Sequence, residues 1–165
     1  MTENNFFLSQ QLATLLERYR LTLSVAESCT GGGLAYQLTA VPGCSAWFEC
    51  GLVVYSNSSK IKLLGVEPQT LEKYGAVSSQ TALEMAKCCI KQCNTSLSLS
   101  ITGIAGPGGG SNSKPVGTVF MGLADQHGFC EARLNNFSSG RHQIREDSIS
   151  FALQWLLEHV TGLFK

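Results

Sequence analysis

The hydrophobic pattern of the chain switches between the period of a helix and the period of a strand. Near the N-terminus, Leu8, Leu12, Leu15, Leu16 and Tyr19 recur every three or four positions and mark one face of a helix. Short apolar runs bounded by Gly, Pro, Ser or Asn are instead typical of strands. The pattern predicts helices over residues 7–19, 33–37, 56–64, 68–74, 79–93 and 141–159, and strands over residues 21–26, 48–55, 97–101, 116–124 and 129–137.

This order of elements predicts an α/β protein. Strands that alternate with helices form a sheet covered on both faces, and the last two strands, joined by residues 125–128, form a hairpin. We therefore expect a three-layer α/β/α sandwich with a mixed, mostly parallel sheet of about five strands. A length of 165 residues, without an internal repeat or a long linker, predicts that residues 1–165 form a single domain.

Composition and charge exclude several classes of protein. The 12 basic and 12 acidic residues balance, which argues against nucleic acid as a partner, and a hydrophobic content of 44% excludes a disordered chain. The uncharged stretches 28–48 and 92–113 are interrupted by Gly, Ser and Thr, so we expect no membrane span. The N-terminus has no signal-peptide pattern, which favours a cytoplasmic protein. So uncharged a surface suits a homo-oligomer, with a dimer favoured.

The seven cysteines predict free thiols. Their number is odd, no CxxC pair occurs, and no histidine stands at ligand spacing from a cysteine pair, so we expect no bound metal and no cofactor. Cys29 follows a predicted strand and precedes a predicted helix, where a thiol pKa can be lowered, but a small buried cysteine is the alternative.

Candidate chemistry gathers where predicted strands end. Ligands of such sheets bind beyond the carboxyl ends of the strands, where Ser28, Tyr55 and Thr102 fall. Lys60 lies in the first turn of a predicted helix, where the helix dipole and burial would both lower the pKa of its amine. A neutral lysine can activate a serine hydroxyl, and Ser45 is the candidate, with Tyr55 between them. The alternative is a solvated lysine.

Two glycine-rich loops are candidate ligand sites. Ser28–Gly33 can direct backbone N–H groups at an anion, and a tight turn is the alternative. Thr102–Gly110 is either mobile or shaped around a ligand. Arg141 and Arg145 are one helical turn apart and could hold a phosphate or carboxylate together, whereas a solvated helix face is the alternative.

Several motifs together resemble one known family. The segments SVAESCTGG, GCSAWFECGLVVYSNSSK, LGV, YGAVS, SITGIAGPGGGSNSKPVGTV and FSSGRHQIR are similar in order and spacing to the C-terminal domain of the competence/damage-inducible CinA family, over about residues 8–160. The N-terminal molybdopterin-binding-like domain of longer members has no counterpart here. Free-standing members of the family are nicotinamide-nucleotide amidases.

The resemblance implies a metal-free hydrolysis of nicotinamide mononucleotide (NMN) to nicotinate mononucleotide and ammonia. It implies Ser45 as nucleophile, Lys60 as base and Tyr55 as proton relay. Ser28, Thr30, Gly31, Thr102 and Gly103 would position the substrate, and Arg141 would bind its phosphate, although FSSGR departs from the family pattern before this arginine. A non-catalytic nucleotide-binding or regulatory module and an amidase for a related amide are the alternatives.

Overall fold

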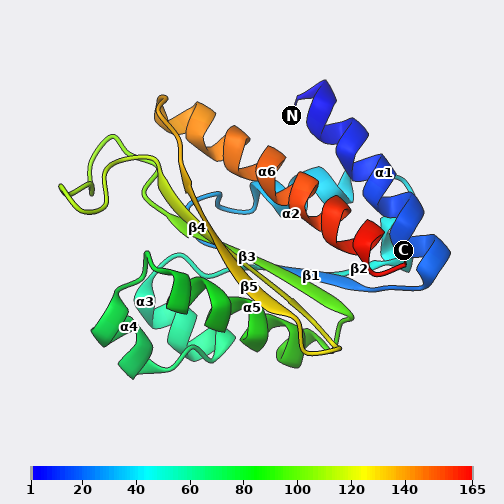
Figure 1. Ribbon diagram of the computed structural model, residues 1–165, viewed down its shortest axis with the longest axis horizontal. Helices are drawn as coiled ribbons and strands as arrows, with labels where there is room; N and C mark the ends of the chain where they lie inside the picture. The colour runs from blue at the N-terminus through cyan, green and yellow to red at the C-terminus, as the bar shows by residue number, and fades with distance from the viewer. Residues whose placement is uncertain (1, 165) are drawn as a thin grey trace.

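The computed structural model describes residues 2–164, which form one mixed sheet between two layers of helices (Figure 1). The strands are β1 (Leu23–Glu27), β2 (Phe48–Val53), β3 (Leu97–Gly103), β4 (Thr118–Asp125) and β5 (Cys130–Asn136). The helices are α1 (Glu3–Tyr19), α2 (Gly33–Thr39), α3 (Asn57–Ser59), α4 (Pro68–Tyr74), α5 (Ser79–Cys93) and α6 (Arg141–Gly162). A 3₁₀ turn, η1 (Cys44–Ala46), precedes β2, and a π-helical turn, η2 (Lys60–Leu64), continues α3.

The sheet has five strands in the order β2-β1-β3-β4-β5. β1 pairs in parallel with both β2 and β3, whereas β4 is antiparallel to β3 and to β5. Four strands therefore run in one direction and β4 runs against them. Helices α1, α2 and α6 cover one face, and α3, α4 and α5 cover the other (Figure 1). The predicted three-layer α/β/α fold with a mixed, mostly parallel sheet is confirmed.

Each face of the sheet has its own hydrophobic core. Under α1, α2 and α6, the core includes Leu12, Leu16 and both tryptophans, Trp47 and Trp155. Under α5 and the α3–α4 segment, a smaller core forms from Ala26, Val54, Leu64, Val66, Leu71, Met85 and Cys89. Alternate residues of β1 enter the two cores because side chains of a strand point to opposite faces in turn. The residue that follows β1 is thus directed to the α5 face.

Local sequence explains where the helices begin. The Ser56 hydroxyl accepts a hydrogen bond from the Ser59 backbone N–H, and the Ser78 hydroxyl accepts one from the Thr81 N–H, as N-cap residues do. Both helix starts agree with the predicted ones. The stretch over residues 56–64 was predicted as a single helix, but it changes to π geometry at Lys60. Single π turns inside helices frequently occur at functional sites.

Candidate active site

Three of the predicted site residues, Ser28, Tyr55 and Thr102, lie at or just after the ends of neighbouring strands at one edge of the sheet. Glu27, the last residue of β1, pairs with Val53 of β2 and with Ile101 of β3. The backbone N–H of Ser28 donates to the Ile101 carbonyl at 2.9 Å, which extends the β1–β3 register by one step. Ser28 and Thr102 are therefore side by side on the α5 face of the sheet, as the sequence predicts for this edge.

The Lys60 amine is fixed against this edge by three hydrogen bonds. Its Nζ is 2.8 Å from the Val54 carbonyl oxygen, 3.0 Å from the Tyr55 carbonyl oxygen and 3.0 Å from the Ser28 Oγ. A neutral amine has two N–H donors and one lone pair. As an ammonium, Lys60 donates to the two carbonyls and to the Ser28 Oγ, and the Ser28 hydroxyl faces the Tyr55 carbonyl at 3.5 Å. Once the amine loses one proton, the two carbonyls keep both N–H groups and the lone pair is free to accept the Ser28 O–H. This geometry is that of a base hydrogen-bonded to a hydroxyl nucleophile.

Burial favours the neutral form of this amine. The Lys60 side chain is only 1% exposed, and burial lowers its pKa from 10.5 to about 8. Among residues 2–164, the ion pairs are Arg133 with Glu131, Arg133 with Glu158, and His159 with Asp125, so no carboxylate holds Lys60 in its charged form. The predicted lowering of the pKa is confirmed, with burial as its main cause.

The structure does not bring Ser45 next to Lys60. Ser45 lies in η1 before β2 and is exposed, so it is at the amino edge of the sheet, whereas Lys60 is at the carboxyl edge. The five residues of β1, at about 3.3 Å each, separate these edges by about 16 Å. Among residues 2–164, the hydroxyl that contacts the Lys60 amine is that of Ser28.

The loop after Ser28 offers donors suited to an oxyanion. Among residues 2–164, no hydrogen bond to another residue uses the backbone N–H of Cys29 or of Thr30. The N–H of the residue after a nucleophile is a common oxyanion donor. Cys29 itself is buried, which raises the pKa of its thiol to about 11, so of the two alternatives for this residue the small buried cysteine holds and the thiol is protonated at neutral pH.

Glu27 fixes the same loop, and sequence reasoning did not assign it a role. Its carboxylate is fully buried and accepts hydrogen bonds from the backbone N–H groups of Gly32, Leu34 and Ala35, at 3.1, 3.1 and 2.8 Å. The only signal in the sequence is a charged residue at the end of an apolar strand. Because these three N–H groups begin α2, Glu27 fixes the turn that leads from Ser28 into the helix.

Thr102 and Gly103, also predicted to bind substrate, make no hydrogen bond to the Lys60–Ser28 pair within residues 2–164 and instead stabilise the edge of the sheet beside it. The Thr102 hydroxyl donates to the Ala76 carbonyl at 2.7 Å, which ties β3 to the segment before α5. A Cβ on Gly103 would lie 2.8 Å from the Thr118 carbonyl oxygen, so this glycine allows β3 and β4 to approach closely. Both residues shape the edge of the sheet on which Ser28 stands.

The two arginines of α6 contact different loops. Arg141 Nη1 donates to the Gly106 carbonyl at 2.7 Å and so holds the loop after β3. Arg145 Nη2 donates to the Thr30 carbonyl at 2.7 Å and so holds the loop that contains Gly31. The two side chains are therefore not a joint clamp on one ligand. Each joins the N-terminal half of α6 to a loop at the carboxyl edge of the sheet.

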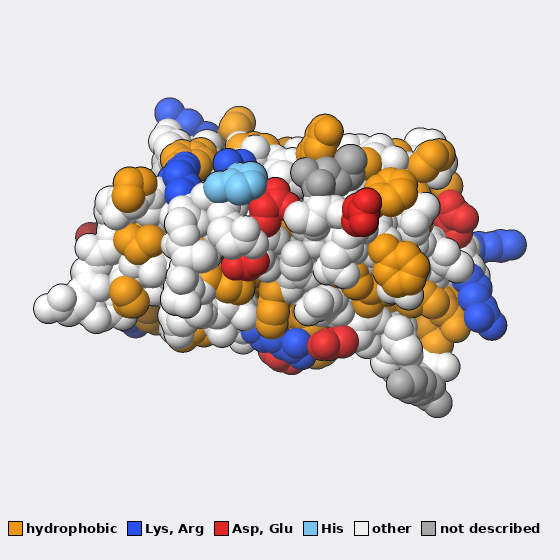
Figure 2. Space-filling model, turned by 90° about the horizontal axis from the view of Figure 1, so that it is seen from above, with side chains coloured by type: hydrophobic (Ala, Val, Ile, Leu, Met, Phe, Trp, Pro, Cys, Tyr) orange, Lys and Arg blue, Asp and Glu red, His pale blue; other side chains and the backbone are white. Residues whose placement is uncertain are grey.

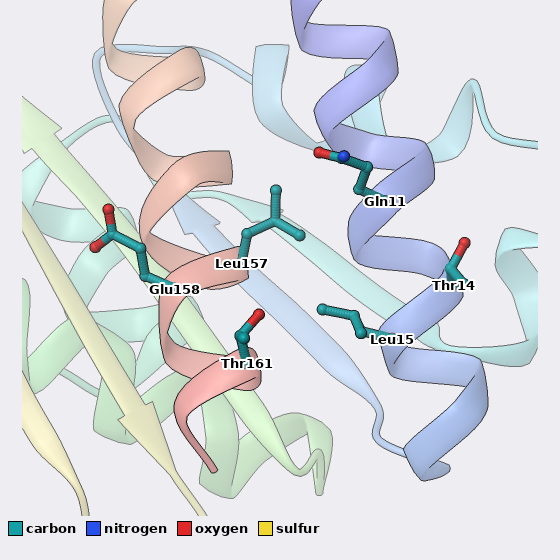
Figure 3. Close-up of a pocket in the computed structure, with 6 residues that line it drawn as sticks. All are labelled: Gln11, Thr14, Leu15, Leu157, Glu158 and Thr161. Carbon is teal, nitrogen blue, oxygen red and sulfur yellow. The ribbon is translucent and has the colours of Figure 1, made fainter. Parts of the chain in front are cut away.

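A pocket lies away from this edge, between α1 and α6. It has a volume of about 660 Å³ and is lined by Gln11, Thr14, Leu15, Leu157, Glu158 and Thr161 (Figure 3). None of these residues belongs to the edge that carries Ser28 and Lys60. The pocket offers one carboxylate and no nucleophile next to a base, so we do not assign the chemistry to it.

Charge is mixed on the outer face formed by α1 and α6. In the space-filling view, basic, acidic and hydrophobic side chains are interspersed on this face (Figure 2). In residues 2–164, no group of three or more His, Cys, Asp and Glu side chains is arranged to hold a metal ion. No helix of this described part is both long enough and apolar enough to cross a membrane.

Fold and site together define a three-layer α/β domain with a buried lysine–serine pair at the carboxyl edge of its sheet. The chain belongs to the family described as the CinA C-terminal domain, whose profile matches residues 5–160. The chain is 44% identical over 158 residues to a putative competence-damage inducible protein of Alkaliphilus oremlandii, and 51% identical over 145 residues to a CinA-like protein of Geotalea daltonii. These alignments cover 96% and 88% of this chain, and 38% and 35% of those two relatives.

Solved structures agree with the family over nearly the whole chain. The competence/damage inducible protein CihA from Agrobacterium tumefaciens has a TM-score of 0.94 at 38% identity, and the alignment covers 96% of each chain. A CinA superfamily protein from Escherichia coli has a TM-score of 0.89 at 33% identity, covering 95% of this chain and 92% of that one. Membership in the CinA family, which the motifs predicted, is confirmed.

Proposed function

We propose that the chain is an amidohydrolase that converts NMN to nicotinate mononucleotide and ammonia in the cytoplasm. The observation that carries this proposal is the 3.0 Å contact between the Lys60 Nζ and the Ser28 Oγ. An amide is a poor electrophile, so its hydrolysis needs an activated nucleophile, a stabilised oxyanion and a proton for the leaving nitrogen. The residues around Ser28 offer each of these.

In the first step, the Ser28 Oγ attacks the carboxamide carbon while its proton moves to the Lys60 Nζ. The new C–O bond converts the carbonyl oxygen to an oxyanion, which the backbone N–H groups of Cys29 and Thr30 stabilise. Preorganised backbone donors need no rearrangement when the charge forms. Glu27 supports this role because its hydrogen bonds hold the turn that carries both groups.

In the second step, the oxyanion collapses and the C–N bond breaks. The protonated Lys60 returns its proton to the leaving nitrogen, either directly or through the phenol of Tyr55, whose side chain is 60% exposed. Ammonia departs and leaves an ester on Ser28. Water then attacks this ester, Lys60 accepts a proton from the water, and Ser28 recovers its hydrogen as nicotinate mononucleotide leaves.

The experiment is an assay of ammonia release from NMN and from a panel of other pyridine amides. We expect the wild type to release ammonia from NMN, and we expect rapid quenching to trap an acyl adduct on the peptide that contains Ser28. Tight binding of NMN without ammonia would contradict the proposal and would identify a nucleotide-binding module. Faster release from another amide in the panel would contradict the choice of NMN as substrate.

A further inference from the structure

A second concave site lies next to the Ser28 loop, between α2 and α6. Its volume is about 310 Å³, and it is lined by Gly31–Gly33 and Gln37 on one side and by His142, Arg145 and Glu146 on the other. Gly33 allows the two helices to approach, because a Cβ there would lie 2.7 Å from the Ile149 Cδ1. None of Ser28, Tyr55 and Lys60 lines this groove, so it is separate from the reacting hydroxyl.

The groove contains hydrogen-bond donors that the protein leaves unpaired. Gln37 is only 2% exposed, and its Nε2 has no hydrogen-bond partner among the described residues. The buried Nε of Arg145 has none either within residues 2–164. Buried polar atoms are paired in most proteins, so two unpaired donors in one concave site point to a ligand that accepts hydrogen bonds. Because one of them belongs to a guanidinium, an anionic acceptor suits them best.

The groove and the nucleophile share one short loop. The Gly31 N–H donates to the Ser28 carbonyl at 3.0 Å, and Arg145 Nη2 donates to the Thr30 carbonyl at 2.7 Å. The loop joins the groove on the α2–α6 face to Ser28, whose hydroxyl points to the α5 face, so a molecule with its anionic end between α2 and α6 would pass over the carboxyl edge of the sheet to reach that hydroxyl. A mononucleotide has this form, since a pentose separates its phosphate from its base.

We propose that the α2–α6 groove binds the phosphate of the substrate through Gln37 and Arg145, and that it selects a phosphorylated substrate over its riboside. This inference rests on the proposed function. It assigns the phosphate to Arg145 and not to Arg141, because Arg141 donates to the Gly106 carbonyl and does not line the groove. The carboxylate of Glu146, which lines the same wall, repels an anion. Removing its charge should therefore strengthen phosphate binding, which is a second test with the opposite expected effect.

The test compares NMN with its dephosphorylated riboside as substrates for the wild type and for Gln37→Met. Methionine has a similar shape but no N–H donor, so we expect the ratio of kcat/KM for NMN to that for the riboside to fall roughly tenfold. Glu146→Gln should raise the same ratio. Gln154→Met, an exposed position on α6, is the matched control and should leave the ratio unchanged. An unchanged ratio in Gln37→Met would overturn the inference.

Inorganic phosphate separates this inference from the proposed function. Binding of orthophosphate can be measured by phosphorus NMR. We expect the wild type and Gln154→Met to bind it equally and Gln37→Met to bind it more weakly. If the wild type releases no ammonia from NMN or the riboside, the proposed function is wrong and this titration still decides the phosphate site. Equal binding of orthophosphate to the wild type and Gln37→Met would overturn the site, whatever the activity.

Discussion

The proposed reaction depends on a single side-chain amine whose pKa is lowered by burial to about 8, so that the neutral form becomes accessible near neutral pH. Two main-chain carbonyls occupy its hydrogens, and the third direction meets the Ser28 hydroxyl at 3.0 Å. The choice of nucleophile and the dependence of the rate on pH both follow from this arrangement. Each can be measured separately.

Two serine variants distinguish the nucleophiles. Ser28→Ala removes the hydroxyl next to Lys60, so we expect the rate of ammonia release from NMN to fall by at least about 10³-fold. Ser45→Ala changes an exposed residue at the other edge of the sheet, and we expect a rate within about twofold of the wild type. The opposite result, with Ser45→Ala inactive and Ser28→Ala active, would exclude Ser28 as the nucleophile.

The rate should rise with pH because the neutral amine is the base. With the pKa of Lys60 at about 8, kcat/KM should increase about tenfold per pH unit below 8 and level off above it. A profile that is flat between pH 6 and pH 9 would contradict this role of Lys60.

Stability should follow the same titration. The folded pKa of Lys60 is below the unfolded value of 10.5, so between about pH 8 and 10.5 this residue binds more protons in the unfolded chain and its contribution to stability rises with pH. Lys60→Met, which lacks the amine, should lack this contribution, so the melting temperature of the wild type relative to this variant should rise with pH over that range. Equal pH dependence of the melting temperature in the wild type and in this variant would contradict it.

At the scale of elements, the turn from β1 into α2 positions the nucleophile and the proposed oxyanion donors together. Glu27 controls this turn, since its carboxylate accepts three backbone N–H groups. Glu27→Gln would direct an N–H₂ group at donors, so we expect it to lower the free energy of unfolding by about 2–3 kcal/mol. Urea unfolding measures this loss. Glu49→Gln, on an exposed residue of β2, is the matched control and should change stability by less than about 0.5 kcal/mol.

The helices and strands could be predicted from the sequence, but the contacts between them could not. Periodicity and N-cap serines predicted the strands and helices, and Lys60 stood out as a cation in a first helical turn. The partner of Lys60 could not be predicted, because Ser28 is 32 positions away and reaches it only through the β1–β2 register. The roles of Glu27 and Gln37 were missed for the same reason, since burial and pairing are properties of the assembled loop.

For the molecule as a whole, the sheet joins two cores, and only one of them contains tryptophan and so reports its unfolding by tryptophan fluorescence. The two tryptophans both lie in the core under α1 and α6, whereas Met85 belongs to the core on the opposite face. If the chain unfolds as one unit, Met85→Ala should lower stability by about 2–5 kcal/mol and shift the tryptophan transition equally with the circular-dichroism transition. Separate transitions would mean that the two layers unfold independently.

The expected homodimer stays a prediction. Light scattering of the purified chain at several concentrations measures it directly. A mass equal to that of one chain throughout would contradict it.

The anchors of the Lys60 amine have a consequence for mutational tolerance. Two of its three oxygen partners belong to the peptide groups of Val54 and Tyr55, which every amino acid carries. Exchange of the Val54 side chain alters packing without removing the oxygen that orients the base. A deep mutational scan should therefore find few chemical dependencies around this lysine and many conformational ones, with insertions, deletions and prolines between residues 53 and 60 the most damaging.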